Sequence, residues 1–254
     1  MSNIIEQYRT SKSGLQDAIR RLRTNIQFSS VDKPVQSIVV TSVMPHEGKS
    51  SVSAYLAIAM AETGKKTLII DCDCRRPMIA SYFKQRPPYG LTEIIAGEVL
   101  PEHAVSQTAQ ENLFFIDTKT LANPVEVLGS KRFADVFARL KQSFDMIILD
   151  TPPLCSFIEA ALLAREADGT VLVIRPGATE IAAAKEAVAQ LEKAEARLLG
   201  VALNGVKESG THYYYSRYYS DGLRKRRKKR ENEGYSFARF VRRRRWRPRY
   251  RFVD

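Results

Sequence analysis

Long apolar runs are absent from this sequence of 254 residues. A helix that spans a membrane needs about 20 consecutive apolar residues, and no stretch of the chain approaches that length. Residues 1–7 also lack the basic region followed by an apolar region that marks a secretory signal. We therefore expect a cytoplasmic protein, long enough for one large α/β domain with a buried core.

Cysteine is scarce in the chain, which has only Cys72, Cys74 and Cys155. Three cysteines are too few for a disulfide framework and are typical of a protein with reduced thiols. The Cys72-x-Cys74 pair could suggest a metal, but no His or Cys pair at zinc-site spacing accompanies it. The sequence therefore predicts neither disulfides nor a zinc site.

Acidic residues are scarce toward the C-terminus, where positive charge accumulates. The whole chain carries a formal net charge of +12, and residues 221–254 contain 15 Lys or Arg against four Asp or Glu, a local charge of +11. Residues 1–220 are therefore nearly neutral, at about +1. We expect residues 221–254 to be a disordered basic tail after a folded, nearly neutral domain.

The segment around Gly48-Lys49-Ser50 organises the rest of the chain. An apolar run at 38–40 precedes it, and a helix-forming run at 53–61 follows it. A strand, a loop and then Gly-Lys-Ser at the start of a helix is the arrangement of a P-loop, in which loop N–H groups and the helix dipole bind phosphate. Lys49 would reach the β- and γ-phosphates of ATP, and the Ser50 hydroxyl would ligate Mg²⁺.

The P-loop pattern is incomplete at its start, because Val43 occupies the position of the usual first glycine. The alternative interpretation is a surface turn followed by a helix N-cap, which does not explain the apolar run before the loop. We therefore expect an ATP site here. Its predicted contacts are Glu47, Gly48, Lys49, Ser50, Ser51 and Asn204.

Two aspartates, Asp71 and Asp73, follow an apolar run at 67–70 that fits a strand buried on both faces of a parallel sheet. In open α/β sheets, ligands bind at the carboxyl ends of the strands. Carboxylates at that edge can hold a metal ion or accept a proton. The alternative is that both aspartates only form the turn after the strand.

Another apolar strand pattern, at 145–150, ends in Asp150. This is the Walker B form, whose carboxylate lies across from the P-loop hydroxyl in the Mg²⁺ shell. Strands that end in Asp are frequent, but this one follows the P-loop by about a hundred residues within the same alternating pattern. We therefore expect Asp150 to lie beside Ser50 as a magnesium ligand.

Strand and helix patterns alternate through most of the chain. This alternation predicts one P-loop domain of the α/β class, with a mainly parallel sheet and helices on both faces. Thr179 is expected to cap the helix that follows it. The expected strands are 37–41, 67–70, 112–117, 145–150, 170–175 and 198–203. The expected divisions are an N-terminal helix at 1–30, the P-loop domain at 31–208, a tyrosine cluster at 209–220 and the basic tail at 221–254.

Residues 12–28 have the apolar spacing of an amphipathic helix. Asp17, Arg20 and Arg23 are three residues apart on it, so they are surface neighbours. They could form a solvated charged face. Alternatively, they could form a subunit contact in which the carboxylate of one chain meets an arginine of the next.

Four motifs together resemble the bacterial tyrosine kinases (BY-kinases) that control capsular and exopolysaccharide synthesis. They are Pro45-x-Glu47-Gly48-Lys49-Ser50, Asp71-x-Asp73-x-Arg75-Arg76-Pro77, residues 147–153 and the tyrosine-rich run at 212–219. The resemblance covers roughly residues 10–220. It is specific, because the Asp-x-Asp motif and the tyrosine cluster are not general features of P-loop proteins.

The resemblance implies a tyrosine kinase that uses ATP and Mg²⁺ and regulates polysaccharide polymerisation and export. It implies autophosphorylation, largely between neighbouring subunits of an octameric ring. The implied catalytic residues are Lys49, Asp71, Asp73 and Asp150, with Ser50 and Asp150 as ligands of Mg²⁺. The implied acceptors are Tyr213, Tyr214, Tyr215, Tyr218 and Tyr219.

The resemblance also implies partners. A separate membrane-spanning co-polymerase would activate the chain and hold it at the inner face of the cell membrane, and a protein-tyrosine phosphatase would reverse the modification. Asp17-x-x-Arg20-x-x-Arg23 is similar to the family's subunit-contact motif Glu-x-x-Arg-x-x-Arg, with a shorter acid.

Two further positions depart from the family pattern. His46 replaces a glycine, and if the position requires a positive φ, His occupies it at some cost. Glu159 stands where the family usually has Asp. Of the two motif aspartates, we expect Asp71 to accept the proton of the incoming tyrosine, whose ordinary pKa is about 10. Asp73 would then assist the metal shell or position the base.

The basic residues at 224–251 go beyond what the family requires. Three partners compete for them. An anionic membrane would attract the charges, nucleic acid would bind them by counterion release, and phosphotyrosine would pair with the arginines. We favour the membrane, because the family works there and the apolar residues within 237–246 could insert beside the charges.

Two other functions remain open. A deviant-P-loop ATPase of the septum-positioning or partitioning type would carry a second lysine near the start of the loop, where this chain has Met44. A non-catalytic, nucleotide-gated scaffold would bind ATP without labelling tyrosine.

Overall fold

The computed structural model describes residues 3–11, 13–29 and 34–206. The expected tyrosine cluster at 209–220 and basic tail at 221–254 lie outside these residues. Among the helices that are described, none combines the length and the apolar character needed to cross a membrane.

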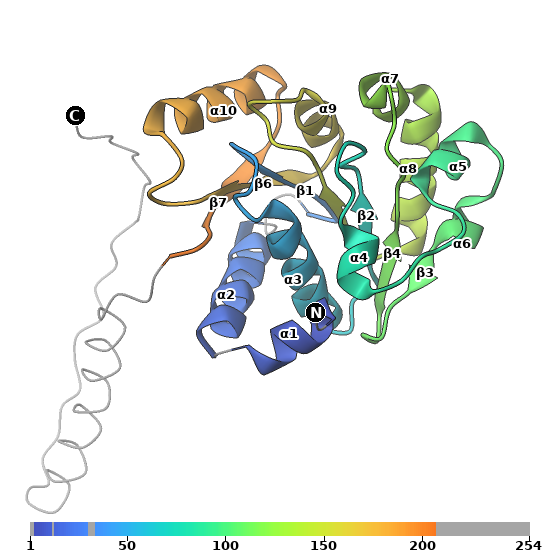
Figure 1. The fold of residues 1–254 in the computed structure, drawn as a ribbon, viewed down its shortest axis with the longest axis horizontal. Helices are drawn as coiled ribbons and strands as arrows, with labels where there is room; N and C mark the ends of the chain where they lie inside the picture. The colour runs from blue at the N-terminus through green and yellow to red at the C-terminus, as the bar shows by residue number, and fades with distance from the viewer. Residues whose placement is uncertain (1–2, 12, 30–33, 207–254) are drawn as a thin grey trace, which may run out of the picture. The chain divides into compact units, whose positions relative to one another are not determined.

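The described residues contain one seven-stranded sheet with the order β3-β4-β2-β5-β1-β6-β7 (Figure 1). Neighbouring strands are parallel except for β3 and β4, which are antiparallel. The predicted mainly parallel sheet is therefore confirmed. The strands are β1 (Ser37–Ser42), β2 (Thr67–Asp71), β3 (Ser106–Gln107), β4 (Leu113–Ile116), β5 (Met146–Asp150), β6 (Gly169–Ile174) and β7 (Leu198–Leu203).

Helices cover both faces of the sheet, as the sequence predicts (Figure 1). Helices α1 to α4 pack on one face, and α5 to α10 pack on the other. The first group is α1 (Ile4–Thr10), α2 (Ser13–Ser29), α3 (Lys49–Ala61) and α4 (Ile79–Phe83). The second group is α5 (Leu91–Ala96), α6 (Pro101–Ala104), α7 (Pro124–Leu128), α8 (Lys131–Ser143), α9 (Glu159–Glu166) and α10 (Ile181–Lys193).

The central strands supply side chains to two hydrophobic cores, one on each face. Ile38 and Val40 of β1 belong to the core under α1 to α4, whereas Val39 belongs to the core under α5 to α10. Every residue of β1, β2 and β5 is buried. This two-sided burial explains why these strands have unbroken apolar runs instead of an alternating pattern.

The expected helix at 12–28 is confirmed as α2, but the sequence predicts one N-terminal helix within 1–30 and the structure has a separate helix, α1, before α2. Asn3 begins α1: its Oδ1 accepts the N–H of Ile5 at 3.0 Å, and its own N–H donates to Glu6 Oε2 at 3.2 Å. Asn followed three residues later by Glu is a capping-box signal that was present in the sequence. Both helices pack on the same core as α3.

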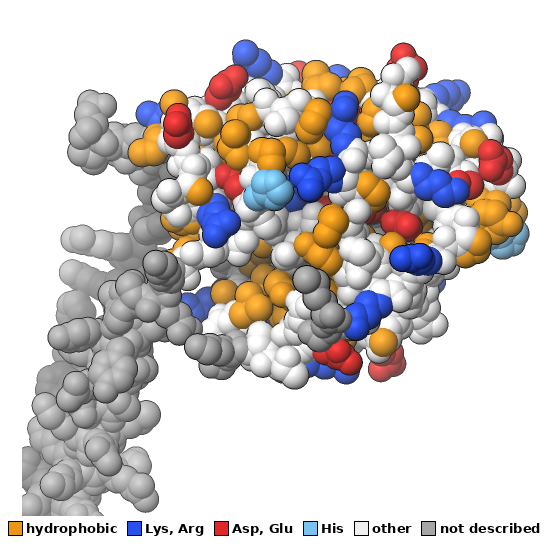
Figure 2. Space-filling view, in the orientation of Figure 1, with side chains coloured by type: hydrophobic (Ala, Val, Ile, Leu, Met, Phe, Trp, Pro, Cys, Tyr) orange, Lys and Arg blue, Asp and Glu red, His pale blue; other side chains and the backbone are white. Residues whose placement is uncertain are grey.

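Charged side chains of both signs are mixed on one face of the described residues (Figure 2). On the face shown in Figure 2, Lys and Arg are spread among acidic and apolar side chains and do not gather into one patch. This distribution agrees with the nearly neutral charge of residues 1–220. It gives no basic surface on this face that would bind nucleic acid by charge alone.

Candidate functional site

The loop between β1 and α3 has the backbone geometry of a phosphate-binding loop. Gly48 precedes α3 with φ of 87°, and a β-carbon there would lie 2.1 Å from Nδ2 of Asn204. Position 48 therefore requires glycine. His46 has φ of 66°, so it occupies a left-handed conformation that costs more for His than for the glycine usual in the resembling family.

Glu47 braces this loop from within. Its side chain is buried, with Oε2 accepting the N–H of Met44 at 2.9 Å and Oε1 accepting the hydroxyl of Thr179. Asn204, just after β7, donates its side-chain N–H to the carbonyl of Glu47 at 2.8 Å. Glu47 and Asn204 therefore lie at the predicted nucleotide site, and both fix the shape of the loop.

Lys49 begins α3 and points to the aspartates at the end of β2. Its Nζ lies 2.7 Å from Oδ2 of Asp73 and donates to Oγ of Ser50 at 3.2 Å. Burial alone would lower the pKa of Lys49, but the charges of Asp150 and Asp73 raise it above its ordinary value. Lys49 is therefore a firmly charged ammonium group beside the loop.

Asp71, the last residue of β2, is completely buried. Its Oδ2 accepts the N–H groups of Met78 and Ile79 at 2.8 and 2.9 Å, and its Oδ1 accepts the N–H of Asp73 at 3.1 Å. Burial and the charge of Asp150 raise the pKa of Asp71 well above its ordinary value. The carboxylate thus shapes the loop after β2 and binds a proton more readily than a free aspartate.

Asp150 ends β5 and is also completely buried. Its Oδ1 accepts the hydroxyl of Ser53 at 2.9 Å, whereas its Oδ2 has no hydrogen-bond partner among the described residues. Burial raises the pKa of Asp150, against the opposing charge of Lys49. A buried carboxylate oxygen without a partner is rare and calls for a ligand.

The donors at this edge fit a magnesium ion bound together with a nucleotide. Mg²⁺ is usually held by one or two carboxylates, with substrate phosphates and waters completing its shell. The unpartnered Oδ2 of Asp150 and the nearby hydroxyl of Ser50 are such donors. Within the described residues, no group of three or more His, Cys, Asp or Glu could hold a metal by protein ligands alone.

The structure therefore brings most of the predicted site residues together at the carboxyl edge of the sheet. These residues are Glu47, Gly48, Lys49, Ser50, Asp71, Asp73, Asp150 and Asn204. Ser51 follows on α3, and its hydroxyl lies 3.2 Å from the hydroxyl of Tyr82, a contact that the sequence reading missed.

Helix α2 carries the three residues of the predicted subunit contact, Asp17, Arg20 and Arg23, but only two of them are exposed. Asp17 and Arg20 are exposed, and Nη1 of Arg20 lies 3.9 Å from Oδ1 of Asp17. Nη1 of Arg23 instead donates to the carbonyl of Ala59 in α3 at 2.8 Å. Arg23 therefore anchors α2 to the P-loop helix, which leaves Asp17 and Arg20 as the exposed part of the predicted subunit contact.

The sequence reading also missed an ion pair beside the site. Arg75 donates from Nε and Nη2 to Oε1 of Glu159, at 3.0 and 2.8 Å. Glu159 is buried at the start of α9, after the strand that ends in Asp150. The sequence shows Glu159 after the Pro-Pro stretch and Arg75 after the Asp-x-Asp pair, but it does not show that these two residues form an ion pair.

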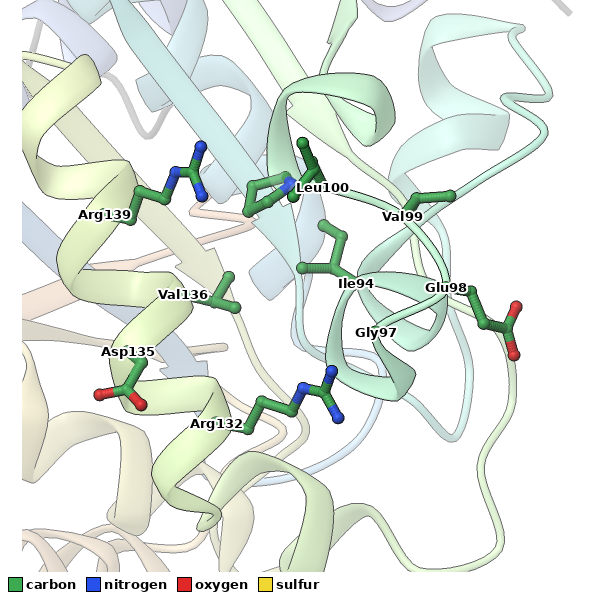
Figure 3. A pocket seen from close by; sticks show the side chains of 10 residues that line it. Ile94, Gly97, Glu98, Val99, Leu100, Arg132, Asp135, Val136 and Arg139 are labelled. Atoms are coloured by element: carbon green, nitrogen blue, oxygen red, sulfur yellow. The ribbon is translucent and has the colours of Figure 1, made fainter.

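A separate cavity of about 340 Å³ lies between α8 and the segment from α5 to α6 (Figure 3). Arg132 and Arg139 extend from α8 toward it, and Ile94 and Leu100 contribute apolar walls. Arg139 pairs with the exposed Glu102 at 2.5 Å. Of the predicted site residues that the structure describes, none lines this cavity, so it is distinct from the site at the sheet edge.

The three cysteines are free thiols, as the sequence predicts. Cys72 and Cys74 are buried in the core under α5 to α10, and burial raises the pKa of both, that of Cys74 to about 11. They are therefore structural residues and not reactive ones.

A family model described as an AAA domain matches residues 36–199 of the chain. Among relatives, tyrosine-protein kinase YwqD of Bacillus subtilis is 38% identical over 82% of this chain and 87% of the relative. Tyrosine-protein kinase CpsD of Streptococcus pneumoniae is 38% identical over 78% of this chain and 88% of the relative.

Solved structures agree with these relatives. The chimerical protein CapA2B2 matches with a TM-score of 0.76 and 32% identity, over 80% of this chain and 89% of that chain. The kinase domain of the Escherichia coli tyrosine kinase ETK matches with a TM-score of 0.73 and 28% identity, over 76% of this chain and 77% of that chain. The cell division ATPase MinD of Pyrococcus furiosus, at 24% identity and a TM-score of 0.58, shares the fold.

Proposed function

The chain belongs to the bacterial tyrosine kinases of capsular and exopolysaccharide synthesis, and on that premise we propose that it transfers the γ-phosphoryl group of ATP to tyrosine. The proposal rests chiefly on two observations. Lys49 Nζ lies 2.7 Å from Asp73, while Asp150 keeps a buried carboxylate oxygen unpartnered among the described residues. The proposed acceptors are Tyr213, Tyr214, Tyr215, Tyr218 and Tyr219 of a neighbouring subunit.

The P-loop holds the phosphates of ATP in this proposal. Its N–H groups and the N-terminus of α3 face the β- and γ-phosphates, and Lys49 moves from Asp73 to the phosphate oxygens. Ser50 and Asp150 hold Mg²⁺, which neutralises charge on the phosphates when bound. Glu47, Thr179 and Asn204 keep the loop in its binding shape.

The two aspartates after β2 serve the incoming tyrosine. The phenol oxygen attacks the γ-phosphorus, the bond from that phosphorus to the bridging oxygen breaks, and ADP leaves. Asp71 accepts the phenol proton, since its raised pKa suits it to hold one. Asp73, released from Lys49, positions the acceptor and the metal shell.

The supporting partners follow from the family. We propose that a membrane-spanning co-polymerase activates the chain and holds it at the inner face of the membrane. We also propose that the exposed Asp17 and Arg20, on the helix that Arg23 anchors to α3, join subunits into a ring. A protein-tyrosine phosphatase reverses the labelling.

The basic residues at 224–251 contact anionic lipid in this proposal. Flotation with anionic liposomes tests this contact by comparing the full chain with a chain truncated after 220. Equal partitioning of the two chains would rule out the tail as an anchor.

Phosphotyrosine mass spectrometry on the purified full chain tests the enzyme activity. The chain receives Mg-ATP with and without the cytoplasmic segment of the membrane protein, beside a Lys49→Met variant. We expect phosphate on tyrosines within 213–219 that disappears in the variant. If no tyrosine is phosphorylated under either condition although ATP still binds, the result would favour an ATPase or a nucleotide-gated scaffold over a kinase.

A further inference from the structure

The guanidinium of Arg75 is held on one edge and one face. Nε and Nη2 both donate to Oε1 of Glu159, at 3.0 and 2.8 Å. The Arg75 Cζ also lies 4.0 Å from the centre of the Phe157 ring. The Arg75 side chain is nevertheless 36% exposed. Glu159 covers one edge of the guanidinium and Phe157 covers one face, so the opposite face is the one left for a further partner.

The positive charge of Arg75 is paired with the carboxylate of Glu159. Only 1% of the Glu159 side chain is exposed, and Arg75 is its one ion-pair partner among the described residues. A buried carboxylate without its cation is strongly unfavourable, so Glu159 keeps Arg75 in place. A guanidinium neutralised in this way attracts a phosphate less than a free one, but it keeps its flat surface for stacking.

This flat surface lies beside the proposed phosphoryl-transfer site. Arg75 follows Asp73 by two residues, and Asp73 contacts Lys49 at 2.7 Å. Phe157 and Glu159 belong to the segment after Asp150. The Arg75 side chain thus joins the segments that leave the carboxyl ends of β2 and β5, which are neighbours in the sheet.

We propose that the exposed face of the Arg75 guanidinium binds the aromatic ring of the acceptor tyrosine. Arginine stacks on aromatic rings, and the stack would extend the Phe157–Arg75 pair by one ring. A phenol on this face would lie next to the segment after β2 that carries Asp73, whose Oδ1 is 3.4 Å from the backbone N of Arg75. Serine and threonine have no ring to stack, so Arg75 would also select tyrosine over aliphatic hydroxyls. This inference rests on the proposed kinase function.

A peptide with the sequence of residues 211–220 is the acceptor for the test, and a copy with every Tyr replaced by Phe is the competitor. The full-length chain is assayed with Mg-ATP and the activating segment as wild type, Arg75→Lys and Arg75→Met. Arg76→Lys is the matched control, since Arg76 is exposed and adjacent. We expect both Arg75 variants to raise the KM for the peptide about tenfold. The Kd of a fluorescent ATP analogue should stay unchanged.

The Phe-substituted peptide separates ring binding from a general structural effect. It should inhibit the wild type and the Arg76→Lys chain equally, and the Arg75 variants about tenfold less well. Equal inhibition of all chains, or a loss of ATP affinity that matches the loss of peptide affinity, would overturn the proposal. If Arg75→Met fails to fold because it leaves the buried Glu159 without its cation, Arg75→Lys decides, because it keeps the charge but has no flat group to stack on a ring.

Failure of the kinase function would look different. In that case the wild type labels no peptide at all, and the fluorescence anisotropy of a labelled Phe-substituted peptide still measures ring binding without turnover. Weaker binding to Arg75→Lys than to the wild type would then retain Arg75 as an aromatic-binding residue. Equal binding would reject it.

Discussion

Asp71 and Asp150 are register partners at the carboxyl ends of β2 and β5, and both are completely buried. Two carboxylates placed this closely repel each other, and each contributes to a site that favours a cation. Lys49 lies on the same edge and supplies part of that positive charge. We expect Mg²⁺ to supply the rest when the nucleotide binds.

Replacing Asp150 by Asn should separate the metal function from stability. We expect the rate of tyrosine labelling to fall by about a hundredfold or more, because a ligand of the proposed metal is lost. Thermal stability should hold or rise, since one of two buried like charges is removed. Labelling rates and thermal melting measure the two effects, with Asp135→Asn on the exposed side of α8 as the control. Full activity in Asp150→Asn would contradict the magnesium assignment.

Gly48→Ala adds only a methyl group, but we expect it to abolish ATP binding. Alanine would have to take φ of 87° and place its β-carbon 2.1 Å from Nδ2 of Asn204. In the double variant Gly48→Ala with Asn204→Ala the clash is gone but the backbone strain remains, so only part of the affinity should return. Titration with a fluorescent ATP analogue measures both. Wild-type affinity in the single variant would show that the loop does not need its present shape.

The central part of the site could be predicted from the sequence because its signals are local. A strand, a loop and Gly48-Lys49-Ser50 are neighbours along the chain, and Asp71 and Asp150 each end an apolar run. Parallel pairing of β2 with β5 then brings the aspartates to one edge. The same logic predicted the sheet and the helices on both faces, since apolar periodicity depends only on near neighbours.

The contacts that brace the site could not be predicted, because their partners are distant in sequence. Thr179 and Glu47 are 132 residues apart, and Arg75 and Glu159 are 84 apart. The expectation that Thr179 caps the following helix was wrong: Glu180 is the N-cap of α10, and the Thr179 hydroxyl donates to Glu47. Thr179 is of a residue type that often caps helices, but here its hydroxyl hydrogen-bonds to the distant Glu47 instead. The two-residue antiparallel strand β3 was missed because it is too short for a periodic signal.

Thr179→Val should destabilise the conformation of the P-loop, although Thr179 is not among the predicted ATP contacts. The substitution keeps the shape of the side chain but leaves Oε1 of the buried Glu47 without its donor. An unsatisfied buried acceptor costs about 1–3 kcal/mol, so we expect that loss in the free energy of unfolding, together with weaker ATP binding. Thr63→Val is the control, since the Thr63 hydroxyl bonds the carbonyl of Met60 near the end of α3. Denaturant unfolding and nucleotide titration should show both losses in Thr179→Val and no loss of ATP affinity in the control.

Asp168 should make the stability of the chain depend on pH. Its Oδ2 accepts the N–H groups of Gln36 and Ser37 and the Ser37 hydroxyl, at 3.0, 2.8 and 2.7 Å, and Oδ1 lies 3.2 Å from Nζ of Lys141. Burial alone would raise the pKa of Asp168, but the Ser37 hydroxyl, the Lys141 charge and the backbone N–H groups hold it below its ordinary value.

A carboxylate with a depressed pKa in the folded state stabilises the fold above its unfolded pKa of about 3.9. That stability is lost as the pH falls through the lower, folded-state value. Asp168→Asn should therefore unfold at lower denaturant concentration than the wild type at pH 7, with a loss of about 1–3 kcal/mol. The difference should shrink as the pH drops below about 4. A constant gap between Asp168→Asn and the wild type from pH 7 to pH 3 would refute this linkage.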